Sequence, residues 1–136
     1  MIFSLSAKSI VAIAVACTAV LAEDYIQCET SDASPSADGC QTLVDGFKGG
    51  ADPSCARPHG SGCHSLDGPG SGNTLGCSFV LCQQKGTQPQ CSDPASAADF
   101  TQKLIDKCAS NGKVGGFYHQ DLGDGHWLNY EFVKPE

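Results

Sequence analysis

The cysteines constrain the fold of this chain more than any other feature. Nine of them occur in 136 residues, and one, Cys17, lies in an apolar N-terminal run. The remaining eight are Cys28, Cys40, Cys55, Cys63, Cys77, Cys82, Cys91 and Cys108. An even number of cysteines in a small secreted chain is typical of a disulfide framework, so we expect four disulfides. The sequence alone does not say which cysteines pair.

The N-terminal segment, residues 1–22, is predicted to be a cleaved secretory signal. One positive charge, Lys8, precedes an apolar run that ends in small residues at Ala22. This run is too short, and too close to the terminus, for a membrane-spanning helix. We therefore expect residues 23–136 to form one secreted, extracellular domain without stable membrane insertion.

The charge balance and the cysteine spacing exclude several kinds of partner. The chain has 8 Lys and Arg against 15 Asp and Glu, a formal net charge of −7, and loss of Lys8 would make it −8. No basic stripe is available for phosphates, so we expect no nucleic acid partner. No Cys-x-x-Cys pair is present, and the oxidising secretory pathway disfavours free thiolates. We therefore expect neither zinc nor another cofactor.

Two segments show helical periodicity. In 34–47, Ser34 is predicted to cap a helix with Pro35 in its first turn, and Gly49-Gly50 to end it. Its apolar stripe is Cys40, Leu43, Val44 and Phe47. The second helix is predicted to begin at Asp93-Pro94 and to end at Asn111-Gly112. Its stripe is Ala97, Phe100, Leu104, Ile105 and Cys108. Each helix thus carries one cysteine on its buried face, where a disulfide would fix it to the sheet.

Four segments are predicted strands: 23–30, 77–83, 114–119 and 127–132. In the last, Leu128, Tyr130 and Phe132 alternate onto one face, which we expect to meet the helices. Residues 51–76 are rich in Gly, Pro and Ser and are predicted to be a loop pinned by its cysteines. The order strand, helix, loop, strand, helix, strand, strand predicts an α+β domain. Its antiparallel sheet would carry two helices on one face, a small disulfide-stapled α/β sandwich.

The segment FYHQDLGDGHWLNYEF, residues 117–132, is the first candidate site. If Leu122-Gly123 forms a two-residue hairpin tip, residues of the two strands would lie opposite each other in pairs. These pairs are His119 with His126, Asp121 with Asp124, and Tyr118 with Trp127. Two His and two Asp could hold a divalent cation, although an exposed tip offers no supporting groups. The plain interpretation is a polar hairpin end, with Tyr118 and Trp127 as a cross-strand aromatic pair. Among functional roles, we favour a binding surface over a metal or catalytic centre.

The glycine-rich loop holds the second candidate site. Arg57, His59 and His64 form the only concentration of potentially positive side chains on this acidic chain. Loops held on a rigid scaffold commonly carry binding residues, so this loop is either a recognition site or a plain disulfide-pinned surface loop.

The catalytic alternative is a small secreted hydrolase of ribonuclease type. Such enzymes combine a His with a Glu, and Glu29 and Glu131 are available. Glu131 lies five residues after His126, so their side chains should point to opposite faces of the strand. No nucleophile motif is present, and we predict a non-enzyme. A hydrophobin-like surface protein is disfavoured because there are no adjacent cysteine doublets.

Three stretches together resemble a known family. They are TSDASPSADGCQTLVDGF, GCSFV and AADFTQKLIDKCASNGKVGG. In this order they resemble the fungal necrosis-inducing-factor family of secreted effectors, and also the fungal killer-toxin-like proteins, over residues 30–47 and 76–133. The resemblance implies a small disulfide-bonded α/β sandwich, secreted by a fungus, that acts without catalysis on a target of a host or competitor cell.

The chain also departs from this family. Phe117-Tyr118-His119-Gln120 stand where the effector family has a cysteine, and Cys55, Cys63, Cys82 and Cys91 are additional. No disulfide pairing and no functional residue is therefore carried over. The basic surface that the resemblance to killer toxins implies does not fit the negative charge.

Overall fold

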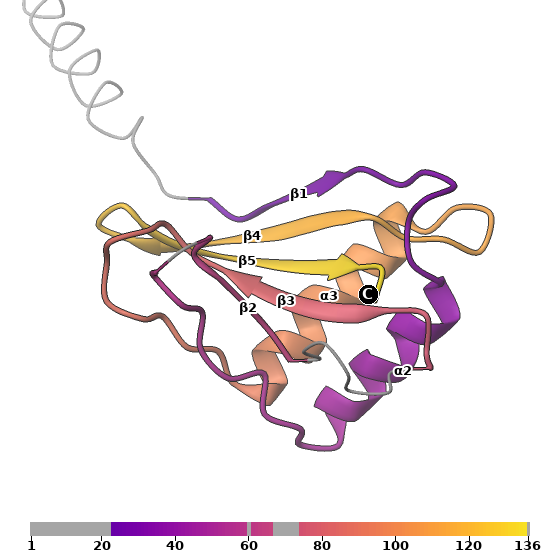
Figure 1. Ribbon diagram of the computed structural model, residues 1–136, viewed down its shortest axis with the longest axis horizontal. Coiled ribbons are helices and arrows are strands. Elements are labelled where there is room, and N and C mark those ends of the chain that lie inside the picture. Colours follow the sequence, from indigo (N-terminus) through magenta and orange to yellow (C-terminus); the bar gives the residue numbers. More distant parts are fainter. Residues whose placement is uncertain (1–22, 60, 67–73, 136) are drawn as a thin grey trace, which may run out of the picture.

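The structure is a computed structural model (Figure 1) and describes residues 23–59, 61–66 and 74–135. The predicted signal, residues 1–22, lies outside the described residues. The strands are β1 (Tyr25–Cys28), β2 (Cys63–Ser65), β3 (Ser78–Cys82), β4 (Gly116–Gly123) and β5 (His126–Val133). The helices are α2 (Ala37–Lys48) and α3 (Pro94–Cys108). Within the described ranges, no helix has both the length and the apolar character that a membrane crossing requires.

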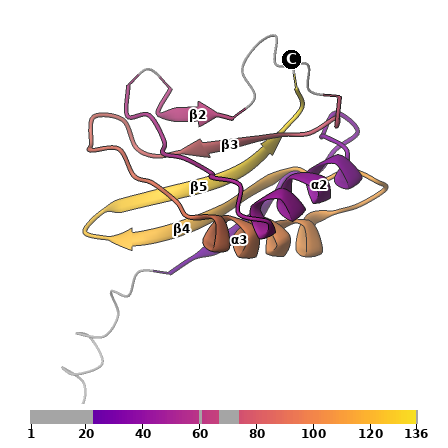
Figure 2. The same cartoon turned by 90° about the horizontal axis from the view of Figure 1, so that it is seen from below.

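The strands form one five-stranded sheet in the order β1-β4-β5-β3-β2. Every neighbouring pair is antiparallel. Helices α2 and α3 lie side by side on the same side of this sheet, as the two perpendicular views show (Figures 1 and 2). The predicted α+β class, with two helices on one face of an antiparallel sheet, is confirmed.

The core lies between the helices and one face of the sheet. Phe100 of α3 stacks on Tyr118 of β4 at 4.3 Å between ring centroids, and Phe47 of α2 meets Phe79 of β3 edge-on at 5.0 Å. The predicted inward face of β5, Leu128, Tyr130 and Phe132, is buried. Each large side chain buried in this way stabilises the fold by about 1.5–3 kcal/mol. Because side chains alternate along a strand, the residues between them lie on the opposite face, which no described helix covers.

Four disulfides hold the layers together, as the cysteine count predicts. Cys28–Cys108 joins β1 to α3, and Cys40–Cys77 joins α2 to the residue before β3. The prediction that each helix is fixed to the sheet through its own cysteine is therefore confirmed. The other two disulfides are Cys55–Cys91 and Cys63–Cys82.

The predicted start of the first helix is wrong by two residues. Ser36, not Ser34, is the N-cap of α2, and its hydroxyl accepts a hydrogen bond from the Gly39 amide at 3.3 Å. The Ser34 hydroxyl accepts from the Ser31 amide instead, at 2.9 Å, and Pro35 therefore precedes the cap. The first helix ends at Lys48, before Gly49, as predicted.

The second helix begins as predicted but ends earlier. Asp93 caps α3 through the Ser96 amide at 2.8 Å. The helix ends at Cys108, because Ser110 and Lys113 exchange two backbone hydrogen bonds across the Asn111-Gly112 turn. A turn of this kind cannot continue a helix.

The strand predictions also need correction. The predicted loop 51–76 contains a short strand, β2, which pairs with β3. The strand predicted at 114–119 runs instead from Gly116 to Gly123. The prediction that cysteines pin this loop is confirmed, since Cys55 joins it to Cys91 and Cys63 joins it to Cys82.

Candidate functional site

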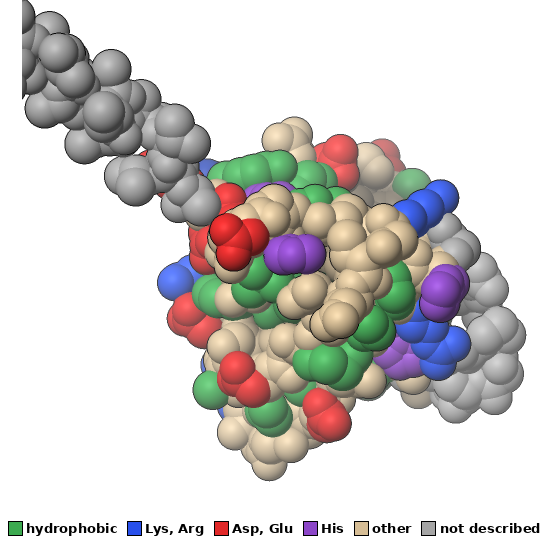
Figure 3. All heavy atoms as spheres, turned by 90° about the vertical axis from the view of Figure 1, so that its left-hand side faces the viewer, with side chains coloured by type: hydrophobic (Ala, Val, Ile, Leu, Met, Phe, Trp, Pro, Cys, Tyr) green, Lys and Arg blue, Asp and Glu red, His purple; other side chains and the backbone are tan. Residues whose placement is uncertain are grey.

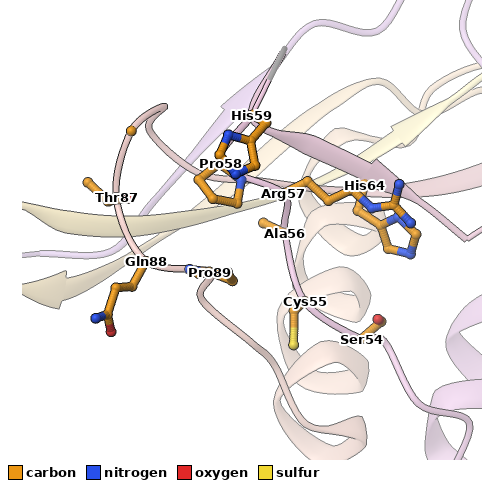
Figure 4. Close-up of a pocket in the computed structure, with 11 residues that line it drawn as sticks. Ser54, Cys55, Ala56, Arg57, Pro58, His59, His64, Thr87, Gln88 and Pro89 are labelled. Carbon is orange, nitrogen blue, oxygen red and sulfur yellow. The ribbon is translucent and has the colours of Figure 1, made fainter.

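A cavity of about 1050 Å³ brings together the three basic residues of the glycine-rich loop. Segment 54–59 forms one wall, His64 of β2 adds to it, and the turn 86–89 lies opposite. In the close-up, the side chains of Arg57 and His64 lie next to each other, and His59 lies beside Pro58 (Figure 4). The predicted grouping of Arg57, His59 and His64 therefore exists, and it lines a cavity that we call the Arg57 pocket.

The two walls of the Arg57 pocket are tied together without regular secondary structure. The Cys55–Cys91 disulfide joins the segments that carry them. Backbone hydrogen bonds add to it: the Ala56 amide donates to Gln90 O at 2.9 Å, and the Gly86 amide donates to Pro58 O at 3.1 Å. The pocket therefore has a defined backbone although its sequence shows no periodicity.

Gln83 organises the opposite wall, which the sequence does not predict. This residue is 2% exposed, and its side-chain amide donates to the Thr87 hydroxyl at 2.7 Å and to Gln88 O at 2.9 Å. Its carbonyl oxygen accepts from the Gln90 amide at 2.6 Å. The Gly-Thr-Gln-Pro run at 86–89 indicates a turn from sequence, but no local signal shows that this turn faces Arg57.

The Arg57 pocket is electrostatically suited to an anion. Among the residues that the structure describes, no Asp or Glu lines it. The ion pairs of the described residues join Lys48 to Asp45 and Lys103 to Asp99, so Arg57 is in neither. Burial, and then the nearby Arg57 guanidinium, hold the pKa of His64 below its usual range. At neutral pH the Arg57 guanidinium thus supplies the permanent charge, while the His64 ring is a neutral hydrogen-bonding group.

The hairpin register differs from the prediction. The two-residue turn is Asp124-Gly125, both at positive φ (55° and 80°), with Gly123 paired to His126. A register shift between Asp121 and Gly123 leaves Leu122 outside the pairing. Such a turn favours Asp-Gly because both central residues need φ > 0. The predicted tip at Leu122-Gly123 is therefore wrong.

The predicted cross-strand pairs are consequently absent. His119 lies opposite Asn129, Asp121 opposite Trp127, and Tyr118 opposite Tyr130. His126 has the same alternation as the buried Leu128, whereas His119 stacks on Tyr25 at 4.5 Å on the other face. The two histidines thus project from opposite faces. As predicted, Glu131 and His126 also lie on opposite faces.

The polar residues of the hairpin mainly serve its own structure. The His119 ring hydrogen-bonds the Asn129 side chain at 2.7 Å. Asp121 accepts from the Gly123 amide at 2.8 Å, and Asp24 accepts from the Asp121 amide at 2.9 Å. Asp124 occupies the turn. These contacts give a structural reason for polar residues at this end of the sheet. In the space-filling view, His side chains gather beside Lys and Arg side chains at one edge of the visible face (Figure 3).

Catalytic and metal-binding groupings are limited in the described part of the chain. None of its ion pairs joins a histidine to a carboxylate within 4.0 Å. The grouping there with ligand spacing is Cys63, Cys82 and Glu131, and both of its sulfurs are engaged in one disulfide. None of His119, Asp121, Asp124 and His126 belongs to it, since the register separates them.

Comparison with known proteins gives no family assignment. No protein-family model matches the chain, and no curated protein matches it.

Proposed function

We propose that this chain is a secreted, cysteine-rich fungal protein of the effector or killer-toxin-like kind, which binds a target of a host or competitor cell and does not act by catalysis. The resemblance of the two helices and the closing strands to such proteins supports this proposal. Four disulfides in a small domain add support, because this framework is typical of extracellular proteins.

The observation that carries the binding proposal is the Arg57 pocket. It combines a cavity, a guanidinium that is in no ion pair of the described residues, two histidines, and a described lining without carboxylates. A guanidinium binds carboxylate, sulfate or phosphate through two parallel hydrogen bonds. We therefore propose that the pocket receives an acidic group on the target.

The shape of the site fits this role. A volume of about 1050 Å³ slightly exceeds the usual range for ligand pockets, about 300–1000 Å³. It can admit an acidic side chain or a charged sugar together with its neighbouring groups. His59 is exposed and His64 half-buried, so they would contact the periphery and the inner part of such a ligand respectively.

The test uses the secreted protein and inorganic sulfate as the acidic probe. Amide chemical shifts are followed by NMR while sulfate replaces chloride at constant ionic strength. We expect shifts at residues 54–57, 59, 64 and 86–88. Arg57→Gln should weaken sulfate binding about tenfold or more, because a charged hydrogen bond contributes about 1.5–3 kcal/mol. Lys107→Gln, which removes an exposed positive charge from α3, is the matched control and should leave binding unchanged.

Two results would contradict the proposal. Equal loss of binding in both variants would mean that sulfate binding depends only on the overall charge of the protein. Turnover of RNA, ester or glycoside substrates that is abolished by His119→Ala or His126→Ala would establish the hydrolase alternative instead. Infiltration and growth-inhibition assays with wild type and Arg57→Gln then test whether pocket binding underlies activity on cells.

A further inference from the structure

The uncovered face of the sheet carries a connected group of aromatic rings. Tyr25 stacks on His119 at 4.5 Å, contacts Phe117 edge-on at 6.1 Å, and is 51% exposed. His119 also contacts Trp127 at 5.7 Å. These residues come from β1, β4 and β5, so the rings extend across neighbouring strands. We call this surface the open face.

Glu131 lies in the middle of the open face. In the strand register it is flanked by Phe117 of β4 on one side and by Val80 of β3 on the other. It is half-buried, and burial, followed by the negative charge of Glu29, raises the pKa of its carboxyl. The two ion pairs of the described residues do not include it.

Among the described strand residues, the open face offers Glu131 no Lys or Arg side chain. Strand alternation places on this face the residues Tyr25, Gln27, Cys63, Ser65, Ser78, Val80, Cys82, Phe117, His119, Asp121, Trp127, Asn129, Glu131 and Val133. None of them is Lys or Arg. A carboxylate that is partly removed from water without a compensating charge is costly, and it favours a partner that brings the missing cation.

We propose that the open face docks a basic segment of a partner protein, with an Arg or Lys side chain that reaches Glu131. The chemistry of the surrounding residues fits such a side chain. Phe117 and Trp127 present rings to which a guanidinium can bind by cation–π contact, and Val80 provides apolar surface for the aliphatic stem. Asp121, opposite Trp127 on the same face, adds a second carboxylate.

This occupant fits the open face better than two others. A second copy of the chain placed face to face would bring two Glu131 carboxylates together without a cation. A neutral sugar could stack on the rings but would leave Glu131 uncompensated. The proposal is also independent of the Arg57 pocket, which carries the opposite charge and uses no residue of the open face.

The test exploits Trp127, which is the sole tryptophan of the chain and lies on this face. The secreted protein is titrated with acetyl-Arg-Gly-Arg-amide and with acetyl-Gln-Gly-Gln-amide, followed by tryptophan fluorescence and amide shifts. We expect the Arg peptide alone to change the fluorescence and to shift the amides of Phe117, Asn129 and Glu131. Glu131→Gln should weaken this response about fivefold or more.

The matched control is Asp106→Asn, which removes a carboxylate from α3 on the other side of the sheet. It should leave the affinity unchanged. Phe117→Leu provides a second variant if Glu131→Gln does not fold, and should weaken the Arg peptide severalfold while keeping apolar bulk.

Three outcomes would overturn the proposal. The first is an equal response in Glu131→Gln and wild type. The second is a shift of the same amides by a neutral chito-oligosaccharide but not by the Arg peptide. The third is concentration-dependent self-association through this face without any probe. Loss of sulfate binding in Arg57→Gln would affect none of these readouts, so the two proposals fail separately.

Discussion

The walls of the Arg57 pocket and the β4–β5 hairpin both carry histidines and other polar residues, but they use them differently. In the hairpin, His119 and Asp121 are hydrogen-bonded within the strands or to the turn. In the pocket, Arg57 is in no ion pair of the described residues, and His59 is exposed. The same residue types thus have structural contacts in one region and remain available in the other.

The difference follows from the interactions that hold the backbone in place in each region. Strand pairing organises the hairpin, and its polar side chains are close enough to hydrogen-bond each other. The pocket walls have little strand pairing, so a disulfide and the buried Gln83 organise them instead. These groups fix the loops, whereas Arg57 is in neither ion pair of the described residues. Binding residues are therefore more readily found in the irregular region than in the regular one.

Removal of the Cys55–Cys91 disulfide should have the largest effect, because it should disrupt the pocket but not the hairpin. The bond joins two cysteines that are 36 residues apart in sequence. Its loss should reduce the free energy of unfolding by about 2–4 kcal/mol. In Cys55→Ala/Cys91→Ala, the two walls should separate and sulfate binding should be lost. Chemical denaturation and the sulfate titration measure the two effects.

The hairpin serves as the internal reference for this variant. Amide shifts of β4 and β5 should be retained under conditions where the protein is folded, because the disulfide does not join those strands. If sulfate binding were undiminished in the folded double variant, the disulfide would not position the pocket.

Gln83 should have a smaller effect, but a larger one than a comparable hairpin residue. Gln83→Ala leaves buried backbone and side-chain groups without partners and should cost about 1–3 kcal/mol of stability. Asn129→Ala removes the half-exposed hydrogen bond to His119 and should cost about 0.5–1.5 kcal/mol. Amide hydrogen exchange should accelerate over 84–90 in the first variant. Equal protection of this segment in both variants would contradict the role given to Gln83.

The periodic parts of the fold could be predicted from the sequence. The apolar stripes around Cys40 and Cys108 and the alternation of Leu128, Tyr130 and Phe132 identify the buried faces, because burial imposes the period of the helix or strand. These patterns also place one cysteine of each helix against the sheet. The strand β2 escapes prediction because its three residues, Cys63–Ser65, are too few to show a period.

Two turns limited the prediction, one for the end of a helix and one for the hairpin site. Asn111-Gly112 ends α3 early, and Asp124-Gly125 sets the hairpin register; all four residues have positive φ. Asp-Gly is a stronger hairpin signal than Leu-Gly, so the correct register was accessible from the sequence. The register matters because each shift changes which side chains face each other.

The composition of the pocket was only half predictable. Arg57, His59 and His64 are close in sequence, and charge alone identifies them. The opposite wall, Gly86–Pro89, is brought to them by the Cys55–Cys91 pairing, which the sequence leaves open among many connectivities. Long-range contacts of this kind have no local pattern, since they depend on the closure of the whole fold.

The smallest predicted effect is the pH dependence of anion binding. Burial and Arg57 lower the pKa of His64 in the folded protein. As pH falls, the His64 ring is therefore protonated at a higher pH in the unfolded chain than in the folded protein. The stability contributed by the neutral ring is therefore present above the unfolded pKa, about 6.5, and is lost as pH falls through the lower folded value. A bound anion should oppose this loss, because it stabilises the imidazolium.

Sulfate affinity should consequently increase as pH falls from about 7.5 to 5, through and below the usual range of histidine. His64→Gln should flatten the part of this increase that His64 contributes. His126→Gln, which changes a histidine of the hairpin outside the pocket, should keep the full profile. If the profile were the same in all three proteins, the pH response would not come from His64. If His126→Gln alone flattened it, the anion would bind at the hairpin rather than in the Arg57 pocket.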